Sequence, residues 1–160
     1  MRMGQIDELA KKTNSKVISA DATSLDDLQN LIEQSMEILG GKIDFVLHSI
    51  GMSINVRKGK AYTDQNYDWT HKGLDVSAMS FHRVMQTLYK NDAMNEWGSI
   101  VALSYMAAQR VFPDYNDMAD NKAFLESSFP IATHTTTSNT RLIDTNDSVS
   151  YTHLTLPTKA

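Results

Sequence analysis

The sequence contains no cysteine, no long apolar run and no excess of basic residues. The lack of cysteine excludes disulfides, zinc–thiolate sites and thiol catalysis. No window approaches the roughly 18 consecutive apolar residues of a membrane span, and residues 1–4 lack the apolar core of a signal peptide. The net charge of -4 argues against an electrostatic nucleic-acid binder, which usually carries a basic excess. These absences favour a cytoplasmic globular protein with neither a membrane nor a nucleic-acid partner.

The 160 residues include 41% hydrophobic residues, enough for one domain with a buried core. Apolar runs predict strands, and apolar residues at helical spacing predict helices. The expected strands cover residues 16–20, 43–48 and 99–103, and the expected helices cover residues 6–12, 24–39, 74–90 and 115–126, with a polar loop over 55–72. Such alternation is typical of a parallel sheet with helices on both faces. We therefore expect an α/β fold, a three-layer, Rossmann-like, doubly wound parallel sheet.

The boundaries of the second helix are the clearest. Ser24 and Asp27 have the spacing of a capping box, in which each side chain satisfies a free backbone N–H at the helix start. The pair Gly40-Gly41 follows the last apolar position and favours a left-handed helix end.

Small or polar residues follow each expected strand. Asp21-Ala22 follows the first, Ser49-Ile50-Gly51 the second and Ser104-Tyr105 the third. In parallel α/β sheets, ligands bind beyond the carboxyl ends of the strands. The sequence therefore predicts a ligand site at one common rim of the sheet.

A tyrosine and a lysine share one face of the last expected helix. Tyr115 and Lys122 are seven residues apart, about two helical turns. A nearby lysine favours the phenolate form of a tyrosine, and a tyrosine can donate a proton to a developing enolate. Spacing alone leaves a second interpretation open, in which the tyrosine is half-buried and the lysine is solvated.

The residues around this pair strongly resemble the enoyl-acyl-carrier-protein reductases of type II fatty-acid synthesis, divergent members of the short-chain dehydrogenase/reductase superfamily. Ordinary members place the tyrosine and lysine four residues apart, a spacing that no tyrosine of this chain shows. The enoyl reductases place them seven apart behind a second tyrosine, as Tyr105, Tyr115 and Lys122 are placed here, and Leu103-Ser104 and Pro113 match as well. The run His48-Ser49-Ile50-Gly51 also resembles the family. The likeness extends over residues 2–126 and is greatest to enzymes of the Bacteroidetes type.

The resemblance implies reduction of the trans-2 double bond of an enoyl thioester, carried by acyl carrier protein, with a hydride from NADH. This reaction is the last step of the fatty-acid elongation cycle. Tyr115 would help to stabilise and protonate the enolate, Lys122 would bind the nicotinamide ribose, and Tyr105 would line the substrate pocket and assist. The other implied contacts are with the cofactor for Asp21, Ala22, Ser49, Ile50 and Gly51, and with the substrate for Ser53 and Met118. No metal site is expected, and the full-length family is expected to form a homotetramer.

The sequence divides at residue 127. Residues 1–127 are predicted to form a partial NAD(P)-binding domain. The domain is expected to be incomplete because the family's glycine-rich turn after its first strand has no counterpart before Ile6. Residues 128–160 are rich in serine and threonine and are predicted to be a disordered, non-native tail. The fold is therefore expected to be truncated at both ends, and the chain by itself to be inactive. Two alternatives stay open: a non-catalytic remnant limited to subunit association, and another reductase of the superfamily such as a ketoacyl reductase, which the seven-residue spacing disfavours.

Overall fold

A computed structural model describes residues 3–135 and 141–144 of the chain. The helices are α1 (Met3–Thr13), α2 (Leu25–Leu39), α3 (Ile54–Arg57), α4 (Tyr67–Leu74), α5 (Ser80–Lys90) and α6 (Asn116–Thr135). The strands are β1 (Ile43–His48), β2 (Met94–Ala102) and β3 (Arg141–Asp144). Short 3-10 turns cover Tyr62–Asp64 and Met106–Ala108, and a π-helical turn over Asp75–Met79 joins α4 to α5.

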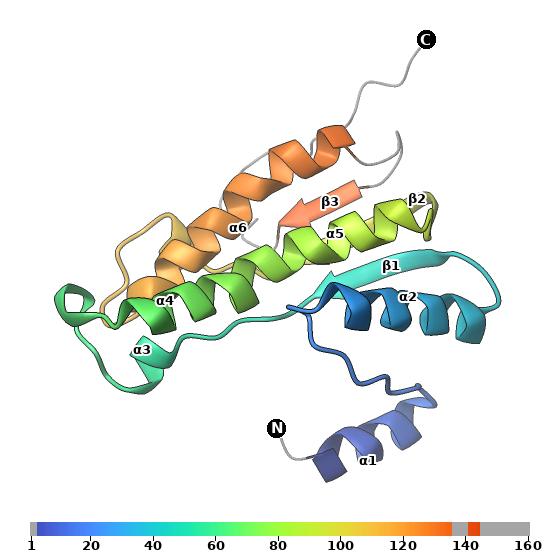
Figure 1. Ribbon diagram of the computed structural model, residues 1–160, viewed down its shortest axis with the longest axis horizontal. Helices are drawn as coiled ribbons and strands as arrows, with labels where there is room; N and C mark the ends of the chain where they lie inside the picture. The colour runs from blue at the N-terminus through green and yellow to red at the C-terminus, as the bar shows by residue number, and fades with distance from the viewer. Residues whose placement is uncertain (1–2, 136–140, 145–160) are drawn as a thin grey trace.

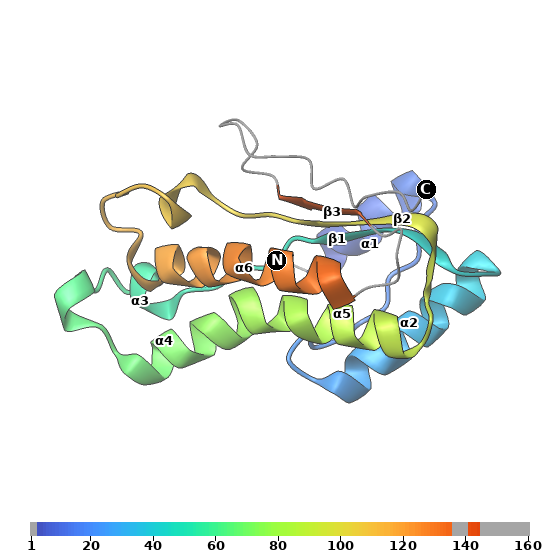
Figure 2. The same cartoon turned by 90° about the horizontal axis from the view of Figure 1, so that it is seen from above.

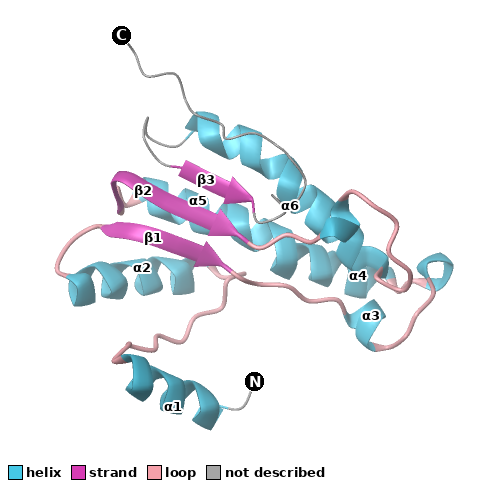
Figure 3. Cartoon of the chain, turned by 180° about the vertical axis from the view of Figure 1, so that it is seen from behind, coloured by secondary structure: helices cyan, strands magenta, loops and turns pink. Residues whose placement is uncertain are grey.

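The strands form one parallel sheet in the order β1-β2-β3 (Figure 3). Helices α2, α5 and α6 lie together on one side of this sheet (Figure 2), while α1 stands apart from it (Figure 1). On β1, the side chains of Phe45 and Leu47 are 57% and 51% exposed. A parallel sheet with helical crossovers agrees with the expected α/β class, but within residues 3–135 and 141–144 the packed helices cover one face only.

The core lies between the sheet and helix α5. Phe81, Met85 and Leu88 recur at helical spacing and are buried, so one face of α5 turns toward the strands. Ile100 of β2 and Leu125 of α6 complete the same cluster. Full burial of each such side chain contributes about 1.5–3 kcal/mol to stability.

Helix α2 begins and ends where the sequence predicts. The Ser24 hydroxyl accepts a hydrogen bond from the Asp27 backbone N–H at 3.2 Å, and Gly40 adopts the left-handed conformation, with φ of 71°. The reciprocal half of the capping box differs, because the Asp27 carboxylate accepts from the Asp21 N–H at 2.8 Å. Asp27 therefore ties the preceding loop to the helix start.

Two expected elements are wrong. Residues 16–20 form no strand, since they pair with no other strand among the described residues, and only Ile18 is half-buried. The expected loop over residues 55–72 contains most of α3, a 3-10 turn and most of α4. Local capping explains both helices, since Ser53 caps α3 and Asn66 caps α4.

The last helix is longer than expected. Helix α6 continues past Glu126 to Thr135, and residues 141–144 pair with β2 as β3. Residues 128–135 and 141–144, predicted to be disordered, therefore have regular structure. Residues 136–140 and 145–160 lie outside the described residues, and the non-native origin of the tail stays a prediction.

Candidate active site

Two tyrosine rings meet at the start of α6. The loop after β2 brings Tyr105 against Tyr115, with ring centroids 4.6 Å apart and planes inclined by 40°. Phe112 packs edge-on against both rings, at 5.4 Å from Tyr105 and 6.1 Å from Tyr115. Aromatic contacts in this range stabilise their arrangement, so the loop and the helix start form one aromatic cluster.

The Tyr115 phenol is held in its neutral form. Burial raises the pKa of Tyr115 above its ordinary value, and the neighbouring Tyr105 phenol raises it further. The net shift of this pKa is therefore away from the phenolate, opposite to the shift expected from a neighbouring lysine. A neutral phenol at physiological pH is nevertheless the form that can donate a proton.

Lys122 lies two turns along α6 and is only 5% exposed. Its ammonium group donates hydrogen bonds to the carbonyl oxygens of Leu103 at 2.7 Å and Ile50 at 3.2 Å. These carbonyls follow β2 and β1, so Lys122 joins the ends of the two strands. This placement excludes the alternative of a solvated lysine.

Gly51 permits close packing against α6. A Cβ atom at this position would lie 2.6 Å from Met118 Cε and 3.8 Å from Lys122 Nζ. Met118 is half-buried, and its sulfur accepts a hydrogen bond from the Ser77 hydroxyl at 3.8 Å. The structure therefore brings Ile50, Gly51, Met118 and Lys122 together beside the carboxyl end of β1.

The other predicted site residues differ in exposure and in position. Ser49 is exposed just after β1, whereas Ser53 is 6% exposed and its hydroxyl is engaged with the Val56 N–H and the Asp117 carboxylate. Asp21 is exposed, and hydrogen bonds from the Thr23 N–H and hydroxyl lower the pKa of its carboxyl. No contact joins Asp21 to the two tyrosines, so the cofactor roles predicted for Asp21 and Ala22 concern a separate region.

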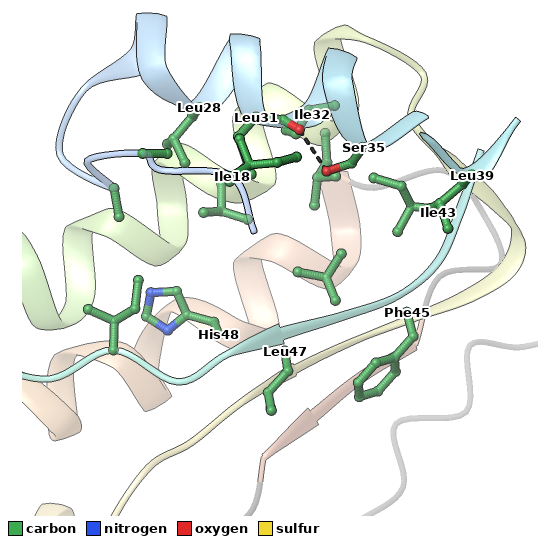
Figure 4. A pocket seen from close by; sticks show the side chains of 16 residues that line it. Ile18, Leu28, Leu31, Ile32, Ser35, Leu39, Ile43, Phe45, Leu47 and His48 are labelled. Carbon is green, nitrogen blue, oxygen red and sulfur yellow. Dashed lines mark hydrogen bonds between the residues drawn. The ribbon is translucent and has the colours of Figure 1, made fainter. Parts of the chain in front are cut away.

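That region borders a cavity of about 430 Å³ between α2, β1 and the segment before α2 (Figure 4). The lining includes Ala22 and Ile50 and is mainly aliphatic, with Leu28, Leu31 and Ile32 from α2. Such a surface suits an apolar or aromatic group better than a phosphate.

Sequence reasoning missed two carboxylates on α6. Glu126 accepts hydrogen bonds from the Ser104 hydroxyl at 2.5 Å and from the Gln109 amide at 2.9 Å, so it holds residues on either side of Tyr105 in the loop. Its position four residues after Lys122 places it on the same helix face, a signal present in the sequence. Asp117, which is fully buried, has no comparable signal.

No metal site is apparent in the part of the chain that the structure describes, since no three histidine, aspartate or glutamate side chains gather there as ligands. Among the same residues, no helix is both long and apolar enough to span a bilayer.

Comparison with known proteins identifies consistent relatives. A family model described as enoyl-(acyl carrier protein) reductase matches residues 1–141. An NADH enoyl-[acyl-carrier-protein] reductase of Rhizobium meliloti is 35% identical over 108 residues, which cover 68% of this chain and 38% of that protein. The FabI enzyme of Rickettsia bellii is 34% identical, with 78% and 47% of the two chains covered. The chain thus spans under half the length of these curated relatives.

Solved structures of a FabI enzyme also match the chain. The crystal structure of FabI from Alistipes finegoldii matches with a TM-score of 0.79 and 59% identity, covering 84% of this chain and 51% of that one. The complex of that enzyme with NADH matches with a TM-score of 0.77 and 59% identity, covering 81% and 47%. These matches confirm the Rossmann-like α/β fold.

Proposed function

The chain belongs to the enoyl-(acyl carrier protein) reductase family, and we propose that it carries the tyrosine–lysine part of an NADH-dependent enoyl reductase active site. The observation that carries the proposal is the stacked pair Tyr105–Tyr115, followed two turns later by Lys122 joining the ends of β1 and β2. The family match covers residues 1–141, a range that includes these three residues.

Tyr115 acts as the proton donor in this proposal. Bound NADH supplies a hydride to the β carbon of the enoyl thioester, which leaves negative charge on the thioester oxygen. The Tyr115 phenol, kept neutral by burial, donates a hydrogen bond to that oxygen and then transfers its one proton to the enolate, which leaves a phenolate that solvent reprotonates. Tyr105 packs against the donor and limits the positions that its ring can take.

Lys122 and the end of β1 form the nicotinamide side of the site. Ile50 and Gly51 lie beside the Lys122 ammonium group, and Gly51 and Ser49 are exposed there. A positive charge next to exposed backbone fits a ribose and its attached ring, so these residues would hold that half of NADH. Ala22 lines the aliphatic cavity, and Asp21 precedes it in the chain, so these two residues would hold the adenine half.

The substrate in this proposal is an enoyl thioester on acyl carrier protein, which the relatives' names state for those enzymes. Met118 and Ser53 are the remaining candidate substrate residues. A cytoplasmic location, the homotetramer and the absence of a nucleic-acid partner stay predictions.

The reductase activity belongs to a longer chain. This chain covers 38% and 47% of the two curated relatives, and we expect the 160 residues alone to be inactive or nearly so. The second candidate function stays a non-catalytic remnant that only associates with other subunits. Relatives named as enoyl reductases leave the ketoacyl reductase alternative without a supporting observation.

A chimera separates the two functions. The matched segment of this chain replaces the corresponding half of the Alistipes finegoldii enzyme, to which it is 59% identical. The chimera is expected to oxidise NADH in the presence of a trans-2-enoyl thioester, while the isolated 160-residue chain is not. A folded chimera that binds NADH yet shows no turnover would support the remnant. Robust turnover by the isolated chain would contradict the expected inactivity.

A further inference from the structure

A buried polar cluster lies directly beneath the Tyr115 end of α6. Asp117 and Asn55 are 0% exposed, and Ser53 is 6% exposed. The three side chains come from α6, from α3 and from the residue that caps α3. The cluster therefore joins the start of α6 to the segment that follows β1.

Both oxygens of the Asp117 carboxylate are engaged across this junction. Oδ1 accepts a hydrogen bond from the Ser53 hydroxyl at 2.5 Å, and Oδ2 accepts one from the Asn55 amide at 3.0 Å. The ion pairs seen in the described part of the chain lie elsewhere, so neutral donors meet this carboxylate. The carboxylate accepts and never donates when ionised, so its two donors fix one orientation.

The two donors are themselves held in place. The Ser53 hydroxyl accepts from the Val56 N–H at 3.0 Å and so caps α3. The Asn55 side chain accepts from the Asn66 N–H at 3.0 Å and donates to the Thr70 hydroxyl at 3.0 Å. Asp117 is thus bound to a platform that already joins α3 to α4.

Two neighbours of Asp117 on α6 contact the same segment. The Asn116 amide donates to the Lys60 carbonyl, and the Tyr62 hydroxyl donates to the Asp120 carboxylate at 3.2 Å. Tyr115 comes immediately before this turn. A displacement of this first turn from the rest of α6, whose Glu126 holds the loop of Tyr105, would therefore move the phenol relative to Tyr105.

A carboxylate is an expensive group to bury at this place. Removing an ionised carboxyl from water is strongly unfavourable unless donors replace the water, and well-packed apolar side chains often stabilise such a position better than buried charge. Compared with such apolar side chains, Asp117 therefore contributes a fixed orientation rather than stability, because its two carboxylate oxygens specify a single arrangement of α6 against α3.

We propose that Asp117 is a positioning residue for Tyr115, which it holds against Tyr105 by fixing the first turn of α6 to Ser53 and Asn55. The proposal rests on the proposed function, since it assumes that Tyr115 is the proton donor. Its test needs no turnover, so its failure and the failure of the reductase function are distinguishable.

The test uses the 160-residue chain with 13C-labelled tyrosine, and Tyr115→Phe assigns the Tyr115 ring signals. The readouts are the nuclear Overhauser effect between the Tyr105 and Tyr115 rings at neutral pH and the urea unfolding equilibrium. The variants are Asp117→Asn, Asn55→Asp and the double variant, which exchanges amide and carboxylate across the junction. Asp7→Asn makes the same chemical change at an exposed position on α1, away from this junction, and is the matched control.

We expect Asp117→Asn and Asn55→Asp each to weaken the ring–ring signal strongly and to raise the unfolding equilibrium constant about tenfold or more. The double variant is expected to recover much of both effects, and Asp7→Asn is expected to change neither appreciably. Ser53→Ala removes one donor and keeps the carboxylate, so it gives a smaller change in the same direction if Asp117→Asn fails to fold. An unchanged ring–ring signal in a destabilised but folded Asp117→Asn or Ser53→Ala variant would overturn the proposal, as would a double variant that recovers nothing.

Discussion

His48 illustrates at the scale of one residue how burial sets side-chain chemistry. It is 2% exposed, its Nε2 lies 2.8 Å from the Ser80 hydroxyl, and Phe81 packs edge-on against its ring. The Ser80 hydroxyl donates to the Val76 carbonyl, so Nε2 carries the proton and donates to Ser80. Burial, followed by the charge of Lys122, lowers the pKa of His48 to about 4, and the ring is neutral at physiological pH.

This shift predicts a loss of stability in mild acid. The unfolded chain takes up the His48 proton near pH 6.5, whereas the folded chain resists it until about pH 4. The stabilisation is therefore complete above pH 6.5 and falls by about 3 kcal/mol as the pH falls through 4. The free energy of unfolding, measured with urea at each pH between 4 and 7, should fall less steeply with falling pH for His48→Gln than for the unaltered chain. The exposed His82→Gln is the control, and an equal change of slope in both variants would contradict the assignment.

Gly51 supplies a second prediction at this scale. Gly51→Ala places a methyl group 2.6 Å from Met118 Cε, so Met118 must turn away. We expect a loss of about 1 kcal/mol in the free energy of unfolding, reduced when Met118→Ala is added. Gly41→Ala has no atom within 4 Å of the new Cβ and is expected to change stability little. Similar losses at both glycines would show that close packing at Gly51 is not the cause.

At the scale of the element, the sequence predicted those helix boundaries that depend on contacts between residues close together in the chain. The start and end of α2 depend on Ser24 and Gly40, which act within one turn, and the sequence predicted both. The spacing of Tyr115 and Lys122 predicted both on one helix, but α6 begins at Asn116, so Tyr115 lies immediately before it. The burial of Lys122 between two strand ends was not predicted, because its partners Ile50 and Leu103 are 72 and 19 residues away. Asp117 and Asn55 are 62 residues apart. Local sequence patterns therefore could not predict their hydrogen bond either.

The α2 cap gives a prediction for one element. Ser24→Ala removes the side-chain acceptor of the Asp27 N–H, and helix N-caps contribute about 1 kcal/mol. We expect a loss of that size in the free energy of unfolding by urea, whereas Ser24→Asp, which restores an acceptor, should lose little. Equal losses in the two variants would contradict a capping role.

At the scale of the whole molecule, the sheet has an open edge and an exposed face. Strand β1 is at the edge of the sheet within the described residues, and Phe45 and Leu47 on it are more than half exposed. The aliphatic cavity borders the same strand. Unpaired edges and exposed apolar side chains promote association between chains.

We therefore predict concentration-dependent self-association of the isolated chain, measured by sedimentation or light scattering. The double variant Phe45→Lys with Leu47→Lys is expected to shift the population toward the monomer, because both side chains are exposed and charge blocks strand pairing. Leu9→Lys with Tyr89→Lys changes two exposed apolar side chains on helices and serves as control. Monomer at all concentrations, or an equal effect of the control, would contradict the role of β1.

The central claim is that Tyr115 is the proton donor of an enoyl reductase site. The most direct measurement is kcat for NADH oxidation with a trans-2-enoyl thioester, compared between the chimera with the Alistipes finegoldii enzyme and its Tyr115→Phe variant. We predict a loss of about 100-fold or more, the usual contribution of a positioned acid, with the fold and melting temperature unchanged. A Tyr115→Phe chimera that retains most of its kcat would contradict the account.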